Sequence, residues 1–155
     1  MLRSASGKLS HGPRQFLKPN LETSNPMNPQ PALSLNQIGQ ICINVHDLDR
    51  ATKFYRDTLG MKYLFAAGKM ALFDCGGIRL MLGIPEKPEF DHPSSILYFK
   101  VGDMQSAHTT LTARGVIFES QPTLIAKMPT HDLWMAFFRD SENNLLSLMS
   151  EVGRG

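Results

Sequence analysis

The sequence predicts an α+β fold in which two tandem βαβββ units pair into a cupped mixed sheet around a cavity, with the helices outside. Three observations predict it. The order strand, helix, three strands occurs twice along the chain. The strand-to-helix junctions at Val45 and Val101 lie 56 residues apart, and the helix ends at Leu59 and Arg114 lie 55 residues apart. A fixed period of this kind indicates a duplicated structural unit.

The composition is that of a soluble globular protein, with 155 residues, 42% hydrophobic and 19% charged residues and a net charge of +2. Basic residues are scattered rather than striped, so no nucleic-acid partner is expected. No apolar run approaches the roughly 18 residues that span a membrane, so no membrane partner is expected either. The two cysteines, Cys42 and Cys75, are not in Cys-x-x-Cys spacing. They favour a reducing compartment, and we expect a cytoplasmic protein.

Residues 1–34 differ in composition from the rest of the chain. They are rich in Ser, Pro, Asn and Gln, and no acidic residue precedes Glu22. We expect a disordered or loosely attached N-terminal arm that has too little apolar surface to form a core. A transit peptide or an extended start upstream of Met27 are the alternatives. The folded domain is expected at residues 35–151, with its units at 36–83 and 95–150.

The first unit begins with alternating apolar residues at 40–45, which predict a strand with one buried face. Asp47 is placed to cap the helix that follows, and Gly60 is placed to end it. The helix has an apolar stripe formed by Leu48, Ala51, Phe54, Tyr55 and Leu59. Strands are then expected at 61–66, 70–74 and 78–83, with a turn at the glycine pair 76–77.

The second unit follows a proline-rich connection at residues 84–95. A strand is expected at 96–101, then a helix from its cap at Asp103 to a glycine stop at Gly115. We expect a strand at 116–120, a long loop containing Pro122 and Pro129, and a closing hairpin of strands 132–139 and 145–149.

A tandem of this unit, with FYRDTLGM closing the first helix and FFRDSENNLLSLM as the last hairpin, resembles the vicinal oxygen chelate superfamily. This superfamily includes glyoxalase I, extradiol dioxygenases, methylmalonyl-CoA epimerase, and fosfomycin and bleomycin resistance proteins. The resemblance covers about residues 36 to 151. It implies a cavity between paired units, and it suggests a lyase, isomerase or dioxygenase. One fold hosts several chemistries in this superfamily, so whether this chain is an enzyme stays open.

The resemblance also implies where a divalent metal ion would bind. Metal enzymes of the superfamily use His, Glu or Gln side chains from the first and last strand of each unit. The matching positions here are Gln40, Met81, Ile96 and Ser147. A thioether, an alkyl group and a neutral hydroxyl do not replace imidazole or carboxylate ligands. With three of four positions changed, we expect no metal at this site and no cofactor.

The same strand register predicts which side chains face the cavity. They are mostly apolar, with a few polar groups that orient a ligand, as in small-molecule sites generally. The predicted ligand-binding residues are Gln40, Asn44, Arg79, Met81, Tyr98, Lys100, Met135, Phe137 and Ser147. Trp134 is expected to point away from the cavity, towards a helix or a partner subunit.

The histidines are the candidates for other chemistry. His46 and His108 are expected at the surface or at helix ends. His92 and His131, together with Asp91 or Asp132, would be the ligands of a displaced metal site. No catalytic residue is assigned, and His131 is offered only as a candidate acid or base.

Two functions from different classes follow. The first is a metal-independent protein of the glyoxalase, bleomycin-resistance and dioxygenase type that binds a small organic molecule in an apolar cavity and forms a homodimer. The alternative is a metal-dependent lyase, isomerase or epimerase, or dioxygenase, with a rearranged metal site. A regulatory or scaffolding protein is a third interpretation.

Overall fold

The computed structural model describes residues 35–154, and the predicted arm at 1–34 lies outside the described residues. The first unit contains one sheet and one helix. Its elements in order are β1 (Gln40–Asn44), α1 (Leu48–Lys53), η1 (Phe54–Thr58), β2 (Lys62–Ala67), β3 (Met70–Cys75) and β4 (Ile78–Gly83). The strand order is β1-β4-β3-β2, with β1 parallel to β4 and the other pairs antiparallel.

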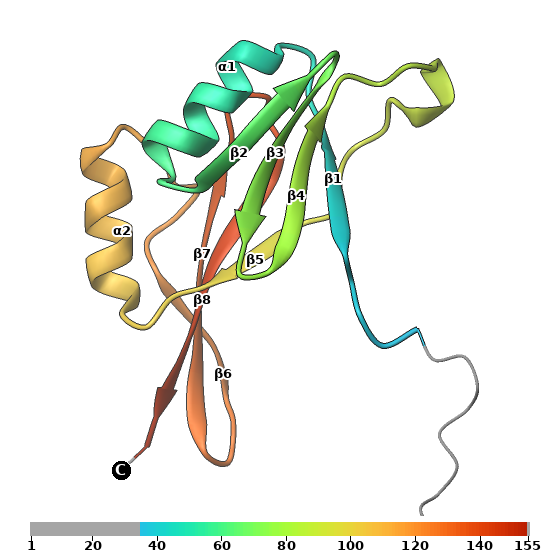
Figure 1. Cartoon of the computed structure of the whole chain (residues 1–155). Coiled ribbons are helices and arrows are strands. Elements are labelled where there is room, and N and C mark those ends of the chain that lie inside the picture. Colours follow the sequence, from blue (N-terminus) through green and yellow to red (C-terminus); the bar gives the residue numbers. More distant parts are fainter. Residues whose placement is uncertain (1–34, 155) are drawn as a thin grey trace, which may run out of the picture. The chain divides into compact units, whose positions relative to one another are not determined.

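The second unit repeats this arrangement. After the short helix η2 (Pro88–Phe90) it contains β5 (Leu97–Lys100), α2 (Met104–Ala113), β6 (Thr123–Lys127), β7 (His131–Arg139) and β8 (Leu145–Gly153). Its strand order is β5-β8-β7-β6, again with the first and last strands parallel. The predicted α+β class and the duplicated βαβββ unit are confirmed (Figure 1). The two four-stranded mixed sheets remain separate and do not close into a barrel.

The helix boundaries form as the sequence predicts. Asp47 accepts a hydrogen bond from the backbone N–H of Arg50, and Asp103 accepts one from Ser106. Gly60 and Gly115 end the two helices with φ values of +72° and +90°, a conformation that costs glycine little. The first helix differs in one respect, because its last turn, η1, is π-helical rather than α-helical.

One element of the second unit was predicted wrongly. Residues 116–120 form no strand, and Phe118 makes only an isolated bridge to Phe138. The first strand after the helix of this unit is β6 instead, and it lies in the segment that was predicted to be a loop. The apolar residues of this segment alternate with polar ones because the apolar side chains pack against the core. Val116 is buried, and Phe118 stacks on His108 with ring centroids 4.2 Å apart. Relative to the first unit, the second unit therefore carries extra residues between its helix and its next strand.

The two units share one hydrophobic core. Each helix packs on its own sheet, α1 on β3 and β4 and α2 on β7 and β8. Ile43, Phe73 and Leu82 of the first unit and Phe138 and Leu146 of the second are almost completely buried in this core. The helix-facing sides of both sheets consequently supply most of this core, and the opposite sides are available for other contacts.

Tyr55 joins the two units at the centre of the core. Its side chain is fully buried, and its hydroxyl donates a 2.8 Å hydrogen bond to Oδ2 of Asp140, which follows β7. Burial, together with the carboxylate of Asp140, raises the pKa of Tyr55 well above its ordinary value. The phenol therefore stays protonated in the folded protein under conditions where an exposed tyrosine ionises.

We expect this phenol to make the protein sensitive to alkali. A tyrosine in the unfolded chain has a pKa of about 10, and the pKa of Tyr55 in the folded protein is higher. Below pH 10, Tyr55 therefore makes its full contribution to the free energy of unfolding. It falls by about 1.4 kcal/mol for each pH unit from 10 towards the folded pKa. Urea unfolding of the wild type and Tyr55→Phe between pH 8 and 11 measures this. The stability difference between the two proteins should shrink above pH 10, and a constant difference would contradict the prediction.

Among the described residues, no helix is long and apolar enough to cross a membrane.

Candidate functional site

The candidate site lies on the open face of the first sheet, opposite the helix. Along β1, Ile43 is buried in the core, whereas Gln40 and Cys42 are exposed and Asn44 is half-buried on the other face. In the register, Cys42 is opposite Met81 of β4. The predicted alternation of this strand thus places its polar residues on the open face.

A cavity of about 570 Å³ occupies this face. Its size falls within the range of small-molecule sites. The wall is mostly apolar, and asparagine, lysine and glutamate are its polar side chains. The lining residues are Cys42, Asn44, Ala67, Gly68, Lys69, Met70, Met81, Gly83, Ile84, Pro85, Glu86 and Phe90. Apolar walls with a few polar groups are typical of small-molecule sites in general.

Asn44 holds the proline-rich connection against the sheet. Its side-chain nitrogen donates hydrogen bonds to the carbonyl oxygens of Phe90 (2.5 Å) and His92 (3.0 Å). Its backbone N–H donates to the hydroxyl of Ser94 at 2.9 Å. These three bonds fix a segment that would otherwise have no strand partner. Asn44 therefore shapes the cavity by placing Phe90 in its wall.

Two further groups on this face are not poised for catalysis. Gln40 donates from Nε2 to the sulfur of Met81 at 3.6 Å, a weak interaction typical of thioether acceptors. Although Cys42 is exposed as a residue, partial desolvation of its thiol raises the pKa of that group, so the nucleophilic thiolate is disfavoured at neutral pH. Cys42 contributes a small apolar surface to the cavity.

The other predicted ligand-binding residues lie together on the second sheet. Tyr98 and Ser147 are paired in the register, and so are Phe137 and Ser147. The rings of Tyr98 and Phe137 meet edge to face with centroids 6.0 Å apart. Lys100 forms an ion pair with Glu151, which lowers the pKa of that carboxyl group. This second group presents aromatic surface rather than free polar groups.

Ser147 is less available than the sequence indicates. Its side chain is completely buried, and its hydroxyl donates to the carbonyl oxygen of Leu148 at 2.8 Å. The nine predicted residues thus form two groups: Gln40, Asn44, Arg79 and Met81 on the first sheet, and Tyr98, Lys100, Met135, Phe137 and Ser147 on the second. The first group provides the cavity residues Asn44 and Met81.

Sequence reasoning missed the cavity residues of the connecting segments. Phe90 and Pro85 come from the connection after β4, and Lys69 from the turn between β2 and β3. The sequence shows a proline-rich connection, but it gives no sign that Asn44 contacts the backbone of this segment. Such a contact follows no period and cannot be found from the strand pattern.

The four positions at which the resemblance would place a metal ion do not fit one here. Met81 and Ser147 contribute a thioether and a buried hydroxyl that is already bonded to the backbone, and Ile96 contributes no donor. A divalent ion prefers nitrogen and oxygen ligands with free lone pairs. Across residues 35–154, no group of three or more His, Cys, Asp or Glu side chains is arranged to hold a metal ion.

The histidines are dispersed. His92 lines a polar hollow of about 490 Å³ next to Arg139, at the far end of β7 from His131. Arg139 lies eight residue positions along the strand from His131, a span of roughly 26 Å. The structure therefore does not bring His92 and His131 together. The ring of His131 lies 3.1 Å from the hydroxyl of Thr130, a local contact that identifies no proton for it to transfer.

The other two histidines have different surroundings. His46 is exposed, as predicted, and its Nε2 lies 2.9 Å from Asp91. The prediction that His108 lies at the surface is wrong, because it is only 7% exposed and stacks on Phe118. Its position on α2 coincides with the inward stripe that includes Met104 and Leu111. Trp134 lines a hollow beside the start of α2, on the helix side of its sheet, as the strand alternation predicted.

The fold and the open-faced cavity define an α+β protein of two βαβββ units. Comparison with models of protein families identifies the family to which it belongs. The model of the Glyoxalase/Bleomycin resistance protein/Dioxygenase superfamily matches residues 37–148, and the chain belongs to this superfamily. A relative, the uncharacterized protein YraH of Bacillus subtilis, is 30% identical over 128 residues, which cover 70% of this chain and 94% of YraH.

Solved structures agree on the fold. A superfamily member from Sphaerobacter thermophilus has a TM-score of 0.63 and 24% identity, and the match covers 77% of this chain and all of that one. A lactoylglutathione lyase from Agrobacterium tumefaciens has a TM-score of 0.60 and 20% identity, with 74% and 93% of the chains covered. At these identities the likeness concerns the fold.

Proposed function

We propose that this protein binds a small organic molecule in the cavity on the open face of the first sheet, without a metal ion. The observation that carries the proposal is the cavity itself, which combines apolar walls with few polar groups. Met70, Met81 and Phe90 offer flexible and aromatic surface. Lys69 and Glu86 lie at its exposed edge, where they can orient a polar substituent of the ligand.

The proposal of metal independence rests on the donor set. Gln40 is the one position of the family pattern that retains a ligand-type side chain, and its amide contacts the sulfur of Met81. A single amide oxygen does not hold a divalent ion. We also propose a cytoplasmic location, since Cys42 and Cys75 are both unpaired thiols.

We further propose that two copies of the chain form a homodimer. The edge strands β2 and β6 expose apolar side chains, with Phe65 53% and Ile125 51% exposed. Tyr98, on the open face of the second sheet, is 44% exposed. Exposed edges and apolar surface of this kind are commonly covered by a partner.

Filling the cavity tests the binding proposal. Met81→Trp adds a bulky ring at the cavity floor, and we expect the affinity for the neutral fluorophore N-phenyl-1-naphthylamine to fall at least about tenfold because the space is occupied. The matched control is Met128→Trp, a methionine 41% exposed between β6 and β7. It should change the affinity by less than about twofold, because it does not line the cavity.

Fluorescence titration measures the affinity, and light scattering on the same samples measures the mass. Equal binding by the wild type and Met81→Trp would contradict the cavity as the site. Elemental analysis checks metal independence. A stoichiometric metal ion in the purified protein would favour the metal-dependent alternative.

A further inference from the structure

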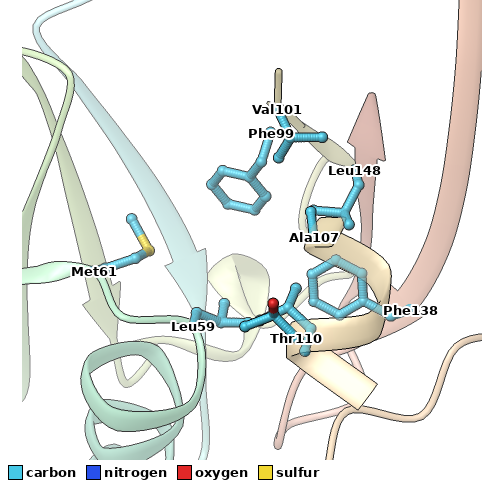
Figure 2. A pocket seen from close by; sticks show the side chains of 9 residues that line it. Leu59, Met61, Phe99, Val101, Ala107, Thr110, Phe138 and Leu148 are labelled. Atoms are coloured by element: carbon cyan, nitrogen blue, oxygen red, sulfur yellow. The ribbon is translucent and has the colours of Figure 1, made fainter. Parts of the chain in front are cut away.

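A second cavity lies on the helix side of the fold, where the two units meet. It is separate from the cavity on the open face of the first sheet and shares no lining residue with it. Its residues are Leu59, Met61, Phe99, Val101, Ala107, Thr110, Leu111, Phe138 and Leu148. Figure 2 shows these side chains surrounding an open space, with Met61 facing Phe99 across it. We propose that this cavity binds a small, uncharged, largely aromatic molecule.

One side of the cavity is formed by buried core residues, and its opening is formed by partly buried side chains. Phe138 and Leu148, of β7 and β8, are buried, and with Leu111 of α2 they belong to the shared core. Phe99 and Met61 are only partly buried and stand above them. A packed floor keeps its shape, whereas the three rotatable bonds of methionine allow Met61 to adjust to a ligand and to contact an aromatic ring.

The lining determines the charge of the ligand. None of the nine lining residues carries an ionisable side chain. A charged group placed between these side chains would lose part of its hydration without gaining a partner, which is unfavourable. Thr110, an exposed residue of α2, supplies the single polar side chain of the lining. A neutral molecule with at most one hydroxyl group matches this chemistry.

The volume determines the size of the ligand. The cavity measures about 300 Å³. An apolar cavity of roughly 150 Å³ takes up benzene, so this one has room for two fused rings. Leu59 and Met61 come from the first unit and the remaining wall from the second, so the ligand touches both units. Its binding should therefore stabilise their packing against each other.

The probe for the test is 2-naphthol, a neutral two-ring molecule with one hydroxyl, compared with naphthalene and with the anion 2-naphthoate. Titration of the full chain, followed by fluorescence and calorimetry, should give one 2-naphthol per chain. Binding of 2-naphthoate should be at least about tenfold weaker because its carboxylate has no partner. Equal binding of the alcohol and the anion would overturn the proposal, as would no binding of 2-naphthol at millimolar concentration.

Substitutions on α2 locate the site. Thr110→Trp places a ring in the cavity, and we expect at least about tenfold weaker binding of 2-naphthol. Thr109→Trp is the matched control, since Thr109 is exposed on the same helix and does not line the cavity. It should leave binding within about twofold. Unchanged binding in Thr110→Trp would overturn the proposal.

A smaller substitution keeps the test valid if Thr110→Trp unfolds the protein. Thr110→Val keeps the shape and removes the hydroxyl, so binding of 2-naphthol should weaken about three- to tenfold while binding of naphthalene stays the same. An unchanged affinity for 2-naphthol would overturn the role of Thr110. Met81→Trp blocks the other cavity. If it abolishes 2-naphthol binding while Thr110→Trp does not, the probe occupies the sheet cavity, and the second site is refuted independently of the first.

Discussion

Replacing Tyr55 by alanine is expected to lower the free energy of unfolding by about 3–5 kcal/mol, the usual cost of truncating a fully buried aromatic side chain. Its ring contacts Phe54 edge to face at 5.8 Å and Phe73 at 6.0 Å. The substitution opens a cavity between the units and removes the hydroxyl that donates to Asp140. Equilibrium unfolding in urea, followed by circular dichroism, measures the loss.

Two variants separate packing from hydrogen bonding at this position. Tyr55→Phe keeps the ring, and we expect a loss of only about 1–2 kcal/mol, because Asp140 retains other donors. Tyr63→Ala removes a tyrosine that is 36% exposed and also packs on Phe73, and it should cost less than Tyr55→Ala. If Tyr55→Ala and Tyr63→Ala cost the same, Tyr55 is not the central contact between the units.

The features that could be predicted from the sequence are those set by local chemistry. Asp47 and Asp103 accept hydrogen bonds from helix N–H groups, and Gly60 and Gly115 adopt positive φ, because these residue types meet those needs wherever they occur. Because these helix caps and glycine stops occur twice at a fixed spacing, both units could be predicted from the sequence. Strands in which apolar and polar residues alternate regularly could be predicted as well, because the alternation is itself a local pattern.

The features that could not be predicted depend on tertiary packing. Val116 and Phe118 alternate like a strand, but their alternation comes from packing under α2 and against Phe138. His108 was expected at the surface or at a helix end. It is buried because its helical position faces Phe118. Periodicity identifies a buried face, but it does not identify the neighbour that buries it.

The candidate site shows the same limit. The strand register placed Asn44 and Met81 on the open face, where they line the cavity. The cavity itself exists because Asn44 bonds two carbonyl oxygens of the connection and brings Phe90 over the sheet. Those acceptors are backbone atoms, which any residue type carries. No side-chain pattern in the connection could therefore have revealed the contact.

The turn between β7 and β8 ties the two units together through charged and polar groups. Glu142, whose side chain is 2% exposed, accepts from Arg50 at 2.7 Å and from the backbone N–H groups of His46 and Asp47. Burial of this carboxylate opposes ionisation, but these hydrogen bonds prevail and lower the pKa of Glu142. Asn144 donates from its side chain to the carbonyl oxygen of Asn44. The start of α1 and the end of β1 are thus held by one turn.

Asp140 organises that turn, and replacing it by alanine is expected to cost about 3–5 kcal/mol. Oδ1 accepts from the backbone N–H groups of Glu142 and Asn144, and Oδ2 accepts from Tyr55 and the Asn144 side chain. Alanine would leave four donors without this acceptor in a region where Asp140 is only 7% exposed. Unpaired buried donors each carry a desolvation cost, which makes removing one partner more damaging than losing the bonds alone.

Asp140→Asn is the matched control. It keeps one oxygen, which can still accept from the two backbone N–H groups, but its NH₂ group meets the donor side chain of Asn144. We expect a loss of about 1–2 kcal/mol, between the wild type and Asp140→Ala. Combining Asp140→Ala with Tyr55→Phe should cost less than the sum of the two, because both remove the same hydrogen bond. Strict additivity in urea unfolding would show that the bond between the units does not contribute to stability.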